Sequence, residues 1–60
     1  MNQPVADLLK NLLANDDPSN YESGDDAAED IVSEIELIHE VTPEEATDVT
    51  DAVCEWYDAN

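Results

Sequence analysis

The charge of this chain works against any compact fold that the chain could adopt. Its 60 residues include 17 acids and one Lys, for a formal net charge of −16. Lys10 lies near Asp7 in a nearly neutral first segment, so residues 16–60 hold the excess of acids. A small domain of one sign repels itself and gains no stability from doing so. We therefore expect that a factor outside the fold selects the charge, and a basic partner surface is the leading hypothesis.

Length limits the chain to one small domain, residues 1–60, whose core supplies about 3–5 kcal/mol. So short a chain leaves no room for a buried catalytic cleft, so we do not expect an enzyme. Cys54 is the single cysteine, which excludes an internal disulfide. No apolar run approaches the roughly 20 residues that a membrane span needs, and the first residues do not resemble a signal peptide. These features predict a soluble, cytoplasmic protein.

Three stretches have the apolar spacing of amphipathic helices, and none alternates with the period of a strand. Val5, Leu8, Leu9, Leu12 and Leu13 share one face of a helix over 3–14, with Asn2 as its cap. Residues 15–24 are turn formers and predict a mobile loop.

A second helix is predicted over 25–41. Its apolar arc is formed by Ala27, Ala28, Ile31, Val32, Ile35 and Ile38. Leu37 instead falls among the acids. Neither Leu37 nor Tyr21 has an evident place in the core, so both are candidates for partner contact.

The third helix has the clearest start signal. Thr42 can cap it, Pro43 suits the first helical position, and Glu45 has the spacing of a capping box. Its predicted range is 43–58, with an apolar face of Ala46, Val49, Val53, Trp56 and Tyr57. Three such helices with short connections predict an all-α fold, a small antiparallel three-helix bundle.

Two acidic faces remain exposed in this arrangement. The third helix has a stripe with spacings of 4, 3, 4 and 3, formed by Glu44, Asp48, Asp51, Glu55 and Asp58. The stripe spans about 21 Å at 1.5 Å per residue, so its charge density is of the same order as that of phosphates along a nucleic-acid strand. The second helix offers Asp26, Glu29, Asp30, Glu34, Glu36 and Glu40.

This pattern is costly for the fold. Like charges four residues apart cost roughly 0.2–0.5 kcal/mol per pair, and the six such pairs in the second and third predicted helices cost about 1–3 kcal/mol. That is comparable to the stability expected of so small a domain.

Other kinds of site fit the sequence less well. An EF-hand built on Gly24 would need acidic or amide ligands at positions where Ser19, Tyr21 and Ser23 stand. His39 and Cys54 supply only two of the three or four ligands that zinc requires. Acyl carrier proteins are also small, acidic helical bundles, but the Asp-Ser-Leu motif of that family is missing here. We therefore predict no metal and no cofactor.

In size, uniform acidity and helical pattern, residues 16–60 resemble phage-encoded DNA-mimic inhibitors of the anti-CRISPR, anti-restriction and uracil-DNA glycosylase inhibitor types. The resemblance is one of composition and involves no motif. It implies a stoichiometric inhibitor that occupies the nucleic-acid channel of a host defence complex, such as a CRISPR-Cas effector or restriction nuclease. The partner would be a basic nucleic-acid-binding protein, with no direct binding to nucleic acid or membrane. The two acidic faces and Leu37 would make the contact.

The alternatives are a small acidic module that dimerises, for example through Leu37, a halophilic protein, and an antitoxin-like protein that neutralises a basic toxin. The response to salt distinguishes a DNA mimic from a halophilic protein. A mimic should be folded at low salt and should lose its partner steeply as salt rises. A halophilic domain should gain stability up to molar salt, where the Debye length falls to roughly 3 Å. Circular dichroism against salt concentration measures the difference, and a chain that is unfolded at low salt would contradict mimicry.

Overall fold

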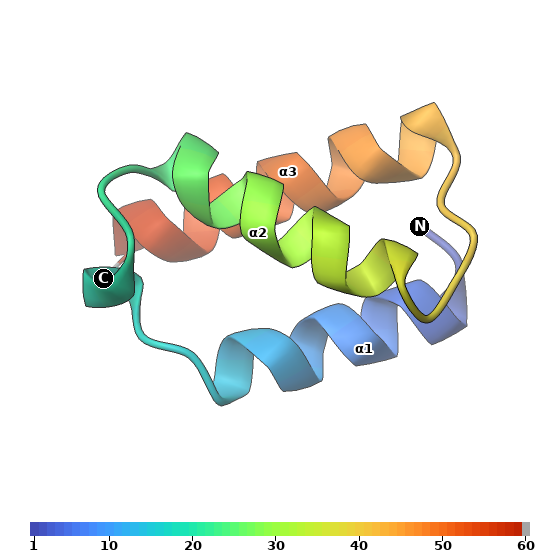
Figure 1. Cartoon of the computed structure of the whole chain (residues 1–60), viewed down its shortest axis with the longest axis horizontal. Coiled ribbons are helices and arrows are strands. Elements are labelled where there is room, and N and C mark those ends of the chain that lie inside the picture. Colours follow the sequence, from blue (N-terminus) through green and yellow to red (C-terminus); the bar gives the residue numbers. More distant parts are fainter. Residues whose placement is uncertain (60) are drawn as a thin grey trace.

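The computed structural model describes residues 1–59, and within them the fold is all-α, as predicted. Three helices lie side by side in up-down-up order (Figure 1). They are α1 (Gln3–Ala14), α2 (Gly24–Glu36) and α3 (Pro43–Ala59), with a short 3-10 helix, η1 (Pro18–Asn20), between the first two. None of these helices is long and apolar enough to cross a membrane.

The start of α1 follows from its sequence. The Asn2 side chain accepts a hydrogen bond from the Val5 amide at 3.0 Å, and Pro4 occupies the first turn. Both features satisfy or remove amide donors that lack partners at a helix N-terminus. Val5 and Leu9 are buried, and the other leucines of this helix are partly buried against the core. The predicted range, 3–14, is confirmed.

The connection from α1 to α2 contains local caps. Asp17 caps η1 by accepting from the Ser19 amide at 3.0 Å, and Ser23 caps α2 by accepting from the Asp26 amide at 3.2 Å. Gly24 is the first residue of α2 and lies beside α3. A Cβ at this position would be 3.4 Å from Sγ of Cys54, which is ordinary van der Waals contact. The mobility expected for residues 15–24 stays a prediction.

The end of α2 differs from the prediction. The helix ends at Glu36 with Leu37 as its C-cap, five residues before the predicted limit at 41. Ile38 was expected to extend the core stripe, yet its side chain is 63% exposed. The physical reason is the connection, because a turn between antiparallel helices needs about 2–8 residues. With Thr42 capping α3, residues 37–41 supply that turn.

The core is made by one face of each helix, and α2 and α3 pack together most extensively. Eight side chains are buried: Val5, Leu9, Ala27, Ala28, Ile31, Ile35, Val49 and Val53. Trp56 and Tyr57 are partly buried against this cluster, as is Val41 from the second connection. No polar side chain within residues 1–59 is buried. Apolar burial between the helices therefore opposes the repulsion among their acids.

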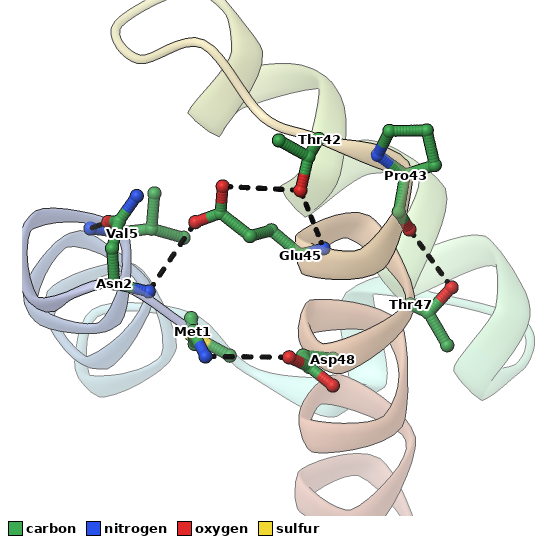
Figure 2. A network of polar contacts seen from close by, with 8 residues as sticks. All are labelled: Met1, Asn2, Val5, Thr42, Pro43, Glu45, Thr47 and Asp48. Carbon is green, nitrogen blue, oxygen red and sulfur yellow. Dashed lines mark hydrogen bonds and ion pairs between the residues drawn. The ribbon is translucent and has the colours of Figure 1, made fainter.

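Polar contacts join the start of α1 to the start of α3 (Figure 2). Thr42 accepts from the Glu45 amide at 3.2 Å, which confirms the predicted cap. The Glu45 carboxylate accepts a hydrogen bond from the Thr42 hydroxyl at 3.3 Å and another from the backbone amide of Asn2 at 3.4 Å. In a capping box the Glu would bond the backbone amide of the cap residue. Here it reaches the N-terminus of α1 instead, so one carboxylate links two helices.

Isoleucines at two places in the chain provide a matched test of this core. We expect Ile35→Val to lower the free energy of unfolding by about 0.5–1.5 kcal/mol, because it removes a buried methyl group. Ile38→Val should change it by less than about 0.5 kcal/mol, because the side chain is exposed. Urea unfolding followed by circular dichroism measures both, and equal effects would contradict the assigned end of α2.

Candidate functional site

The acidic stripe of α3 lies where the sequence predicted it. Glu44, Asp48, Asp51, Glu55 and Asp58 are all exposed, and Val49 and Val53 on the opposite face are fully buried. Burial of that face fixes the rotation of α3 about its axis. All five carboxylates therefore point to solvent along one side of a 17-residue helix.

One carboxylate of the stripe has a cationic neighbour. The N-terminal amine of Met1 lies 3.4 Å from Oδ2 of Asp48, and this is the one ion pair among residues 1–59 (Figure 2). The Asp48 side chain remains 54% exposed. Exposed pairs of this kind contribute little free energy, so Asp48 stays accessible to another cation. The other four carboxylates have no hydrogen-bond or ion-pair partner within residues 1–59.

The acids of α2 are spread around its exposed side and do not form one stripe. At 100° per residue, Asp26, Asp30 and Glu34 follow one line along the helix, and Glu29 and Glu36 follow another. All five are exposed. Glu40, which was predicted to continue this face, lies beyond the end of α2 at Glu36. Its position relative to the helix face is therefore set by the connection.

An open depression runs beside α2, with Thr50 of α3 as its far wall. Four carboxylates border it, from Asp25, Glu29, Asp30 and Glu36, together with the half-buried Val32. Asp25 was not among the predicted site residues. It lies in the first turn of α2, where acids are favourable. The packing of α2 on α3 adds it to the acidic surface.

Acids from α2 and α3 also converge near Cys54. Burial raises the pKa of the Cys54 thiol, and the negative charges of Asp25, Asp58 and Asp51 raise it further. The start of α2 therefore lies next to the last half of α3, and Asp25 adds its charge there to the charges of Asp51 and Asp58. A basic surface at this end of the bundle can contact acids of both helices.

Leu37 is the most exposed of the large apolar side chains, at 87%. The prediction that it has no place in the core is confirmed, and Ile38 beside it shares that exposure. The signal for Ile38 was available in the sequence. A helix over 25–41 followed by a cap at Thr42 leaves no residues for the turn.

Tyr21, which had no evident place in the core from the sequence, packs against the core in the structure. Its ring is half-buried against the core, and its hydroxyl donates a hydrogen bond to the Asp16 carboxylate. The Tyr57 hydroxyl donates to the Tyr21 carbonyl oxygen at 3.3 Å. Tyr21 therefore closes the end of the bundle over η1 and is engaged within the chain.

His39 and Cys54 lie too far apart to bind one metal. Cys54 touches Gly24 at the start of α2, and His39 follows the end of that helix. Thirteen residues separate the two ends by about 20 Å at 1.5 Å per residue. Within residues 1–59, no three side chains of His, Cys, Asp or Glu are grouped as metal ligands.

Comparisons with known proteins give no match to a family, to a curated protein or to a solved structure.

The contact between Tyr21 and Asp16 predicts a raised pKa for the Tyr21 phenol, which a titration can measure. The hydrogen bond to Asp16 raises the pKa of Tyr21 to about 12, and burial and negative neighbours add to this effect. The same bond lowers the pKa of Asp16. A phenol pKa that is raised in the folded state stabilises the fold below pH 10 and loses this contribution as pH rises from 10 to about 12.

Tyr57→Phe leaves Tyr21 as the only tyrosine. Ultraviolet absorbance should then titrate near pH 12, and adding Asp16→Asn should move the midpoint toward 10. A folded Tyr57→Phe protein that titrates at pH 10 would contradict the contact.

Proposed function

We propose that this chain is a stoichiometric inhibitor that occupies the nucleic-acid-binding site of a basic protein. A CRISPR-Cas effector or a restriction nuclease has the kind of channel required, and the chain would act in the host cytoplasm. One observation supports the proposal above all. The α3 stripe presents five exposed carboxylates in a regular line on one helix, and within residues 1–59 the only ion pair they make is that of Asp48 with the terminal amine of Met1.

The spacing of the stripe suits a surface that binds phosphates. Five charges over about 21 Å give one charge per 4–5 Å of helix axis, and one DNA strand carries about one phosphate per 3.4 Å. Lys and Arg side chains are long and flexible, so they can adjust to this difference. The carboxylates of α2 would meet a second row of basic groups on the same channel.

Electrostatics would supply both rate and specificity. Opposite fields accelerate encounter and disfavour partners of the same sign. Each exposed carboxylate contributes about 0.2–1 kcal/mol with one basic partner, so tight binding needs many such pairs at once. The chain offers this number because its two acidic faces together expose eleven carboxylates, five from the α3 stripe and six from Asp26 to Glu40.

The test is capture from a bacterial lysate at low salt with the chain immobilised. We expect it to retain a basic nucleic-acid-binding protein that excess duplex DNA releases. Affinity should fall steeply with salt, because ion pairs across the interface are screened. Retention of proteins that DNA does not displace would contradict mimicry and favour a general acidic interaction module.

A charge-matched pair of variants tests the stripe itself. Asp51→Lys with Glu55→Lys should weaken binding about tenfold or more, because two attractive contacts become repulsive. Asp7→Lys with Glu22→Lys changes the same four charge units, from −16 to −12, at exposed positions outside both acidic faces. It should bind nearly as well as the unchanged protein. Equal losses would show that net charge alone matters and would remove the stripe from the proposal.

A further inference from the structure

Two large aliphatic side chains are exposed next to each other where α2 ends. Leu37 is 87% exposed and Ile38 is 63% exposed, and together we call them the apolar corner. Apolar side chains scattered singly over a surface need no explanation. Two neighbours of this size are different here, because the buried core within residues 1–59 has only eight residues and burying two more would have strengthened a marginal fold.

The backbone holds the apolar corner in place. The Leu37 amide donates to the carbonyl oxygens of Ser33 and Glu34, at 3.3 and 3.2 Å. The amides of Ile38 and His39 both donate to the Ile35 carbonyl oxygen, at 3.0 and 2.8 Å. These bonds close the last turn of α2 and direct the chain into the connection. The corner is thus ordered before binding, which reduces the entropy cost of contact.

The charges around the corner restrict what can cover it. Glu34, Glu36 and Glu40 are exposed neighbours in sequence. A second copy of this chain would bring the same negative charges against them, and an anionic lipid surface would be repelled in the same way. A partner must therefore be positively charged around the apolar contact.

The area of a typical protein interface also indicates that the partner contacts the acids around the apolar corner. A standard interface buries about 800 Å² on each partner, and the whole chain exposes 3978 Å². Two side chains supply a small part of such an area, so the contact must extend over the acids around them. Interfaces commonly combine a few apolar anchors with a polar rim.

We propose that the apolar corner is the anchor of the interface and inserts into an apolar socket rimmed by Lys and Arg on the partner. The inference rests on the proposed function, because the partner is the same basic protein. The inference adds an apolar contact to the electrostatic ones, and a nucleic-acid backbone would not make this apolar contact. The acids of this chain give attraction over distance, and Leu37 with Ile38 gives the short-range contact that slows dissociation.

The experiment uses two probe peptides of equal charge. One is a basic amphipathic peptide of Lys and Leu, and in the other Ser replaces every Leu. Anisotropy of the labelled peptides at 0.15 M salt gives both dissociation constants. We expect the full chain to bind the Lys/Leu peptide at least about tenfold more tightly, since one buried aliphatic side chain is worth about 10- to 100-fold.

The double variant Leu37→Ala with Ile38→Ala should lose this preference and keep its affinity for the Lys/Ser peptide. The double variant Asp51→Lys with Glu55→Lys should weaken the binding of both peptides by the same factor. Helix content by circular dichroism should be unchanged in both variants, because all four positions are exposed. Amide shifts in nuclear magnetic resonance should concentrate at residues 37–41 with the Lys/Leu peptide.

Two results would overturn the inference. The first is a preference for the Lys/Leu peptide that survives the double alanine variant. The second is a dimer in sedimentation that the same variant dissociates, because a second copy would then be the occupant. The lysate experiment is separate. Duplex DNA could fail to release the captured protein while the peptide preference still depends on Leu37 and Ile38. That result would support the apolar corner as a binding site and contradict nucleic-acid mimicry.

Discussion

Apolar packing between α2 and α3 is the interaction on which the rest of this structure depends. Ile31 and Ile35 of α2 and Val49 and Val53 of α3 are buried in the core that these helices share. The outer faces of both helices carry acids, whose repulsion costs about 1–3 kcal/mol at low salt. Burial of this cluster must offset that cost. The same packing rotates each helix so that its carboxylates face solvent, so core and acidic surface have one cause.

Local contacts at the helix ends set how the helices meet. At one end, Gly24 at the start of α2 lies beside Cys54 of α3. At the other, Glu45 links the cap of α3 to the Asn2 amide, so an acid at a helix start serves the fold while its neighbour Glu44 faces solvent. Acids of this chain therefore have two roles. Asp17 and Glu45 accept from backbone amides at helix starts, and the exposed acids along α2 and α3 give the surface its charge.

Local signals predicted α1 and the start of α3 well. Asn2 and Thr42 cap these helices in the structure, as the sequence indicated, because a cap depends on a few adjacent residues. Ile38 and Tyr21 were misplaced for a different reason. The periodicity of α2 continues past Glu36, and only the need for a turn before Thr42 ends it. Tyr21 lies in a segment without periodicity, so its place depends on Asp16 and on the distant Tyr57.

The sequence by itself determined the helix faces and the acidic stripe of α3, because both follow from the 3.6-residue period within one helix. Tertiary structure alone decided which acids gather on a common surface. Asp25 joined the acids near Cys54 because α2 runs antiparallel to α3, and Glu40 left the face of α2 because the chain turns there. Leu37 and Ile38 became neighbours at the surface for the same reason. Proximity between elements depends on packing and turn length, and neither is encoded in the periodicity of a single helix.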